Sequence, residues 1–114
     1  MKVFVYYNLH KHLFSVRALQ GENRGRVIMH AYEVSLTNVT FKVSESGRQR
    51  VLKERRKNVH AGVQGILSDQ HQLLDRQVTY DPYKYSTFVT LEGYPVHTAR
   101  EVHLKDRRIT AIMA

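Results

Sequence analysis

Residues 44–58 read Ser-Glu-Ser-Gly-Arg-Gln-Arg-Val-Leu-Lys-Glu-Arg-Arg-Lys-Asn, a stretch unlike the sequence on either side of it. Between residues 48 and 57 it contains six Lys or Arg side chains and one acidic side chain, Glu54, so it supplies five of the chain's eight net positive charges. Most residues from Arg48 to Asn58 favour helices, no proline interrupts them, and Ser44 is a suitable N-cap. We therefore predict a helix here.

This predicted helix is unusually polar. Its only apolar residues are Val51 and Leu52, a stripe that can bury no more than one side of a helix. As a strand, the same residues would place Lys or Arg on both faces of a sheet, which is worse for covering a core. The helix is therefore favoured, with most of its circumference facing water or a ligand.

The sequence before this stretch consists of short runs in which apolar and polar residues alternate, as is typical of strands. These runs are residues 2–7, 13–19, 26–31, 33–36 and 39–43. Residues 8–12 and 20–25 have the composition of turns, so the first two runs form a hairpin. Residues 37–38 break the last two runs apart.

Beyond the basic stretch, residues 59–67 alternate as a strand, and residues 68–77 form a polar connection with a helical turn at residues 72–75. A pattern from the first part then returns. Residues 25–36 align without gaps with residues 93–104, with Gly, Ala, Glu, Val and Leu coinciding, and residues 5–11 match residues 78–84. The alternative is chance agreement between β-rich segments, which all look similar.

These patterns predict an α+β fold, mostly antiparallel sheet, built from two similar β units with one inserted basic helix. At 114 residues, with 42% hydrophobic and 25% charged residues, the chain has the size and composition of one folded domain. We divide it into a first β unit at residues 2–43, the basic helix and strand at 44–67, the connection at 68–77 and a second β unit at 78–113.

Composition limits the compartment and the partners. The chain contains no cysteine, its first apolar segment is too short for a signal peptide, and no apolar run approaches the roughly 20 residues of a membrane helix. We expect a cytoplasmic protein without membrane contact. A pI near 10.0 favours nucleic acid or another acidic surface as partner. The repeat fits a pseudo-symmetric monomer as well as a dimer, which leaves the oligomeric state open.

The basic stretch can bind phosphates, because clustered cations displace counterions and the Arg side chain makes bidentate phosphate contacts. The alternative is a solvated surface helix. With Glu54 as the sole acidic side chain from residue 48 to 57, however, repulsion would destabilise such a helix in the absence of a partner. The predicted nucleic-acid contacts are Arg48, Arg50, Lys53, Arg55, Arg56 and Lys57, with Lys11 and Lys84 added from two turns.

Histidines offer weaker candidates. His10 and His12 stand at a turn, and His30, His97 and His103 lie in other runs, but a zinc site needs three or four ligands at suitable spacing. We therefore expect exposed histidines and predict no metal and no cofactor. His60 follows the cationic run, where neighbouring cations would favour the neutral form that a general base needs. His60 and His10 are the catalytic candidates, against the simpler role of a strand or surface histidine.

Tyr7, Tyr80, Tyr83 and Tyr85 fall near two matching turns, beside Lys11 and Lys84. Aromatic rings interleaved with lysines can stack bases of single strands. The alternative, which we prefer, is that these rings line the edge of the core with their hydroxyls in water.

The runs at residues 41–44, 47–51 and 56–61, preceded by residues 25–27 and 30–31, resemble small proteins of tailed bacteriophages and prophages. The resemblance spans most of residues 3–67. It implies a setting in an infected bacterial cell, where small basic proteins act on nucleic acid or on host enzymes, and it assigns no activity or binding residue.

The sequence thus favours a binding protein that contacts DNA or RNA mainly through phosphates. A second hypothesis is a phage inhibitor that docks on an acidic surface of a host protein. A third is a small metal-independent nuclease using His60 or His10, although the chain has no phosphate-cradling glycine loop, nucleophile elbow or carboxylate pair.

Overall fold

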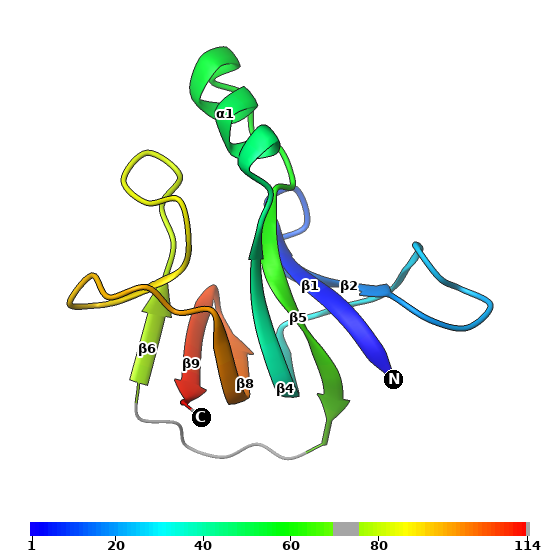
Figure 1. The fold of residues 1–114 in the computed structure, drawn as a ribbon. Coiled ribbons are helices and arrows are strands. Elements are labelled where there is room, and N and C mark those ends of the chain that lie inside the picture. The colour runs from blue at the N-terminus through cyan, green and yellow to red at the C-terminus, as the bar shows by residue number, and fades with distance from the viewer. Residues whose placement is uncertain (70–75, 114) are drawn as a thin grey trace.

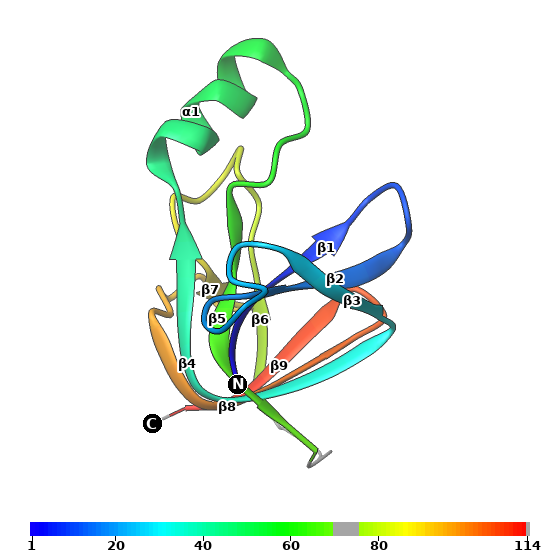
Figure 2. The ribbon, with the colours of Figure 1, turned by 90° about the vertical axis from the view of Figure 1, so that its right-hand side faces the viewer.

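The computed structural model describes residues 1–69 and 76–113 of the chain. Most of this part is strand, with one short helix that stands out from the sheet (Figures 1 and 2). The elements in chain order are β1 (Lys2–Asn8), β2 (Leu13–Ala18), β3 (Val27–Ala31), β4 (Glu33–Val43), α1 (Glu45–Glu54), β5 (Ala61–Ser68), β6 (Arg76–Thr79), β7 (Val89–Thr90), β8 (Thr98–Lys105) and β9 (Arg108–Ile112).

The strands form one sheet in the order β3-β2-β1-β5-β4-β8-β9-β6-β7. All the strand pairs in the described residues are antiparallel, and β4, with β5 and β8 as its neighbours, lies at the centre. The prediction of an α+β fold that is mainly antiparallel sheet is therefore confirmed.

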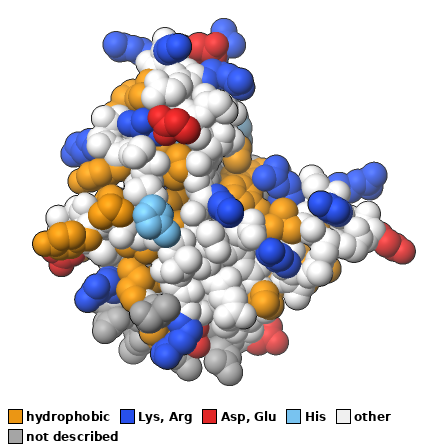
Figure 3. Space-filling view, viewed as in Figure 1, with side chains coloured by type: hydrophobic (Ala, Val, Ile, Leu, Met, Phe, Trp, Pro, Cys, Tyr) orange, Lys and Arg blue, Asp and Glu red, His pale blue; other side chains and the backbone are white. Residues whose placement is uncertain are grey.

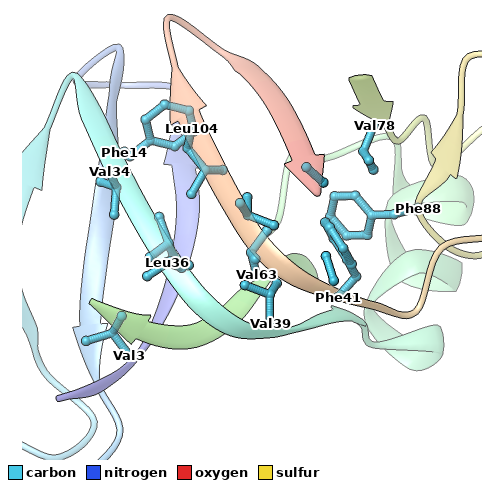
Figure 4. Close-up of a cluster of buried hydrophobic side chains, with 14 of the residues drawn as sticks. Val3, Phe14, Val34, Leu36, Val39, Phe41, Val63, Val78, Phe88 and Leu104 are labelled. Carbon is cyan, nitrogen blue, oxygen red and sulfur yellow. The ribbon is translucent and has the colours of Figure 1, made fainter. Parts of the chain in front are cut away.

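The sheet curls so that one face encloses the core. The turn between β8 and β9 reaches β1, where the Arg107 guanidinium lies 4.9 Å from the Tyr7 ring centre, although β1 and β8 are not neighbours. Side chains from both halves of the sheet therefore meet inside the curl, as Figure 4 shows. The buried cluster includes Val3, Val5, Phe14, Val16, Val34, Leu36, Val39, Phe41, Val63, Val78, Phe88, Val102 and Leu104.

Alternation decides which side chains enter this core. In β1, Val3 and Val5 are fully buried, whereas Lys2 is exposed and Phe4 is half-buried on the opposite face. Burying a valine side chain contributes about 1.5–3 kcal/mol, so a one-residue slip of register would lose the contributions of both valines at once.

The predicted break at residues 37–38 is a β-bulge within one long strand. Asn38 has a φ of 51°, and the pairing of β4 with β5 changes register between Thr37 and Thr40. Predicting two separate strands was wrong because pairing on both sides holds β4 together across the bulge. The helical turn expected at residues 72–75 lies outside the described residues, and β6 already begins at Arg76.

The helix is shorter than predicted. It ends at Glu54 because Arg55 adopts the left-handed conformation, with φ 55° and ψ 30°, and donates its backbone N–H to Val51 O. The strand expected from residue 59 begins at Ala61. Arg55, Arg56 and Lys57 therefore lie in the loop that leads from α1 to β5.

Candidate nucleic-acid interface

Helix α1 leaves the sheet where the β4–β5 hairpin ends. The backbone N–H of Ser44 donates to His60 O at 2.7 Å, the last bond of that ladder. Ser44 Oγ then accepts from Gly47 N at 3.2 Å, so Ser44 is the N-cap that the sequence predicted. Figures 1 and 2 show α1 projecting beyond the end of the strands.

A close approach of backbones fixes the base of α1. A Cβ added to Gly47 would lie 2.7 Å from the Cβ of His60, too close for any residue except glycine without a shift of the helix. Val51, one turn further on, is buried. These two contacts hold one side of α1, and apart from the partly buried Arg48 and Leu52 the remaining helix residues are exposed.

Arg48 fastens α1 to a second part of the chain. Its Nε donates to Pro82 O at 3.0 Å and to Tyr85 O at 2.9 Å, and its Nη1 pairs with Glu45 Oε1 at 3.0 Å. The Arg48 side chain is only 15% exposed. A hydrogen bond from Gln49, together with the charge of Arg48, lowers the pKa of Glu45 below its usual value. The geometry therefore gives Arg48 a tethering role within the molecule.

The other five predicted contacts are exposed. Arg50 and Lys53 lie on α1, and Arg55, Arg56 and Lys57 follow it in the loop. Figure 3 shows Lys and Arg side chains gathered at the end of the molecule that α1 occupies, with acidic side chains beside them. We call Arg50, Lys53, Arg55, Arg56 and Lys57 the cationic tip.

Arg55 occupies a backbone position that favours glycine. Left-handed residues at helix ends are usually Gly, because a Cβ raises the energy of this conformation by about 1 kcal/mol. Arg55 has φ 55° there and an exposed side chain. The chain thus carries a solvent-facing cation where glycine would be more stable.

Lys84 and Lys11, the two predicted contacts outside the basic stretch, are both exposed. Lys84 lies in the loop that Arg48 holds beside α1, next to Tyr83. Lys11 lies in the β1–β2 turn, which Figure 2 places at the same end of the sheet but to the side of α1. Lys84 can therefore extend the surface of the tip, whereas Lys11 is separated from it.

His60, just before β5, is held by both of its ring nitrogens. Its Nδ1 is 2.9 Å from Asn58 O, and its Nε2 is 2.7 Å from the Tyr80 hydroxyl. Because a carbonyl only accepts, Nδ1 donates to Asn58 O, and in the neutral ring Nε2 then accepts from the Tyr80 hydroxyl. Burial raises the pKa of Tyr80, which keeps its hydroxyl a donor. His60 therefore serves as a structural link between the hairpin and the loop after β6.

The four tyrosines divide between two places. Tyr80 stacks on Phe88 at 5.1 Å, Tyr83 is exposed, and the Tyr85 carbonyl accepts from Arg48, all in the segment beside α1. Tyr7 lies on β1, where its ring meets Phe14 edge-on at 5.3 Å. Of the four, Tyr83 is the ring with the most accessible surface beside the cationic tip.

The remaining histidines are dispersed. His10 and His12 are exposed in the β1–β2 turn, His30 Nδ1 lies 2.9 Å from Ser15 Oγ, and His103 Nε2 lies 3.0 Å from Glu33 Oε1. His97 lines a surface pocket of about 540 Å³ with Arg76, Glu92 and Tyr94. In residues 1–69 and 76–113, no three His, Asp or Glu side chains are grouped so that they could hold a metal ion.

Sequence reasoning missed two features of this region. Lys42 is exposed on β4 close to the start of α1, and its position two residues before the N-cap Ser44 was the available signal. The tether formed by Arg48 had no signal, because its acceptors are backbone carbonyls far along the chain. Across the described part of the chain, no helix has both the length and the apolar character that crossing a membrane requires.

Comparison with known proteins supports the phage resemblance. Residues 1–112 match the model of a family described as Mycobacterium phage L5 gene 82 protein. The "Gene 82 protein" of Mycobacterium phage L5 is 38% identical over 120 residues, which cover 97% of this chain and 95% of that protein. No solved structure matches the chain. The chain therefore belongs to the bacteriophage protein family of Mycobacterium phage L5 gene 82.

Proposed function

We propose that this phage protein binds nucleic acid through its phosphates, with the cationic tip as the contact surface and Lys84 at its side. One observation carries the proposal. Five exposed Lys and Arg side chains follow one another between residues 50 and 57 on a projecting element, and Glu54 is the acidic residue among them. Such a local field attracts polyanions more strongly than the same charge spread over a surface.

We also infer that the chain consists of two similar β units. In the first unit, β2 lies between β1 and β3. In the second unit, β7 takes the corresponding place, because it pairs with β6 on one side and its Val89 forms a β-bridge with Pro95. Similarly, β5 lies between β1 and β4, as β9 lies between β6 and β8. The units meet at the β4–β8 pair, where Ser35 faces His103, two residues that the sequence repeat aligns with each other. A two-fold relation between the units would produce this pairing.

On this inference, the basic helix is an addition to a duplicated sheet. The hairpin β8–β9 is closed by Asp106 and Arg107 alone, whereas its counterpart β4–β5 is joined by residues 44–60. A short turn is therefore sufficient to close a hairpin of this sheet. The longer connection between β4 and β5, with its exposed cations, is better explained by binding than by folding.

Charge reversal tests the proposal. We expect Arg55→Glu/Arg56→Glu to abolish the electrophoretic shift of duplex DNA, single-stranded DNA and RNA, because the change removes two phosphate contacts and repels others. Arg24→Glu/Arg26→Glu is the matched control, since it changes net charge equally at exposed positions in the β2–β3 loop. Retained binding by the first variant, or equal loss in both, would refute a localised contact surface.

The same cations could bind an acidic face of a host protein, as the phage family suggests by its setting in an infected cell. Capture from lysate with and without nuclease treatment separates the two. If nucleic acid is the ligand, the purified protein alone should produce an electrophoretic shift of DNA or RNA. A partner captured after nuclease treatment, combined with no shift of any nucleic acid, would favour the host protein.

A further inference from the structure

The outer face of the first half of the sheet carries two aromatic rings and an arginine in contact. Phe4 and Tyr6 alternate with the buried Val3 and Val5 on β1, so both rings lie on the face away from the core. Their ring centres are 6.2 Å apart. Arg17, paired with Phe4 across β1 and β2, holds its guanidinium 4.9 Å from the centre of the Phe4 ring.

A glycine on β5 lets the Phe4 ring lie close to the sheet. A Cβ on Gly62 would clash with Phe4 Cζ and with the backbone oxygen of Val5, so any other residue would displace both the ring and the β1 backbone. The Arg17 guanidinium lies over this ring, and the Arg17 side chain is half-buried on the outer face. Guanidinium planes and aromatic rings are the two surfaces on which unpaired bases stack in proteins.

The charge of this face is positive. β1, β2, β3 and β5 contain no Asp or Glu, whereas Lys2 and Arg17 lie on the outer face of β1 and β2. On β4 the exposed Lys42 is paired with Gly62 and so stands level with the ring-bearing part of β1. A phosphate backbone crossing this face would meet cations and, on these four strands, no carboxylate side chain.

The strand pairing leads from this face to the start of α1. Strand β5 runs beside residues 2–5 of β1. Its Ile66 pairs with Lys2, its Gln64 with Phe4 and its Val63 with Val5. Gly62 pairs with Lys42 on the other side, two residues before Ser44 and the start of α1. A strand of nucleic acid can therefore pass from the rings of β1, beside Lys42, to the cations of α1.

We propose that this face, formed by Phe4, Tyr6 and Arg17, is a base-stacking subsite for single-stranded nucleic acid. The proposal rests on the function proposed above and names its substrate class. In a duplex the flat faces of the bases are stacked on one another, whereas in a single strand they are free to lie on Arg17 and Tyr6. The tip would hold phosphates while this face holds bases.

The test compares a 20-nucleotide oligothymidine with an abasic oligomer carrying the same number of phosphates. We expect wild-type protein to bind oligothymidine about tenfold more tightly, the effect typical of one stacked base. Tyr6→Leu and Arg17→Lys should lose this preference while binding the abasic oligomer unchanged, since the first retains bulk and the second retains charge. Tyr94→Leu removes a ring that is 69% exposed in the connection between β7 and β8, and it should change neither affinity.

The two proposals fail in different ways. Equal affinity of wild type for both oligomers, or a full preference retained by Arg17→Lys and Tyr6→Leu, would overturn the stacking subsite. Binding to the abasic oligomer that is lost in Arg55→Glu/Arg56→Glu would still support phosphate binding by the tip. Failure to bind either oligomer would overturn both proposals. Thermal unfolding of each variant checks that a lost preference does not come from a lost fold.

Discussion

Strands β4 and β8 pair with each other at the centre of the sheet, and each forms a hairpin with its other neighbour, β5 or β9. The connections that close the two hairpins differ greatly in length. Asp106 and Arg107 close β8–β9 as a tight turn with φ values of 48° and 67°. Residues 44–60 join β4 to β5 and include α1 and five exposed cations. Since a short turn suffices for one hairpin, the longer connection is better explained by what it displays than by what the sheet requires.

Each hairpin end also holds an arginine in the left-handed conformation, and the two arginines differ in their surroundings. Arg107 lies over the ring of Tyr7, so a cation–π contact offsets part of its backbone cost. Arg55 is exposed at the end of α1. The comparison suggests that Arg107 contributes to stability and Arg55 to binding, and the following variants test that difference.

The largest effect is expected from removing the connection between β4 and β5, which contains α1. Replacing residues 45–59 by Asn-Gly would close the hairpin directly on the Ser44–His60 pair, in the manner of β8–β9. We expect a cooperatively folding protein whose affinity for nucleic acid near physiological salt falls at least about a hundredfold, because the five cations are lost together.

Circular dichroism and thermal unfolding establish whether this shortened protein keeps its sheet, and filter binding measures its affinity. A folded variant that still binds as wild type would contradict the role given to the tip. The matched control replaces Asp106-Arg107 by Asn-Gly, which keeps the short turn and should leave affinity near that of wild type.

Arg48→Ala should have the next largest effect, on stability. The change removes hydrogen bonds to Pro82 O and Tyr85 O, and a bond from a charged donor contributes about 1.5–3 kcal/mol. We expect urea denaturation to show a loss of about 2 kcal/mol in the free energy of unfolding. Arg50→Ala, at an exposed site on the same helix, should cost under about 0.5 kcal/mol. Equal losses in both would mean that Arg48 is not a tether.

Tyr80→Phe should lower the free energy of unfolding by about 1 kcal/mol, because it leaves His60 Nε2 without its donor. Burial raises the pKa of Tyr80 above its ordinary value of 10.0, so its stabilising contribution is complete below that pH and is lost as pH rises through the folded-state pKa. Wild type should therefore lose stability above about pH 10, and Tyr80→Phe should lose less.

The matched variant is Tyr83→Phe, which removes an exposed hydroxyl from the same loop. Chemical denaturation at pH 7 and pH 11 compares the three proteins. If Tyr80→Phe matched wild type at both values, the hydrogen bond to His60 would contribute nothing to the fold.

The smallest effect distinguishes the two left-handed arginines. Arg55→Gly should raise the free energy of unfolding by about 0.5–1 kcal/mol, since glycine accepts this conformation without a Cβ clash. Its affinity for nucleic acid should fall, because the tip then has one cation fewer. Arg107→Gly removes the interaction with Tyr7 and should gain less stability or none. A larger gain at residue 107 than at 55 would reverse the assignment of roles.

Much of the fold was readable in the sequence, because period-two patterns set the faces of strands and Ser44 is a good N-cap. The helix end was not, since Arg55 is a good helix former and gives no sign of a left-handed residue. The bulge at Asn38 was predicted as a break between two strands. Asn is a residue typical of turns, and the sequence alone does not show whether such a residue ends a strand or forms a bulge within it.

The candidate site was predictable as a cluster of charge but not in its geometry. Counting charges could not separate Arg48, which is clasped by Glu45 and two carbonyls, from the exposed Arg50 two residues away. Nor could sequence reveal that Phe4 lies over Gly62 with Arg17 above it, because that arrangement depends on the register of three strands.

The most direct test of the central claim is the salt dependence of binding to a random-sequence duplex, measured for wild type and for Arg55→Ala/Arg56→Ala. If the tip neutralises phosphates, the logarithm of the wild-type binding constant falls steeply with the logarithm of salt concentration. The variant's slope should be shallower by about two, because each neutralised phosphate accounts for about 0.9 of the slope. Identical slopes for the two proteins, or a wild-type affinity that does not depend on salt, would contradict phosphate binding by the cationic tip.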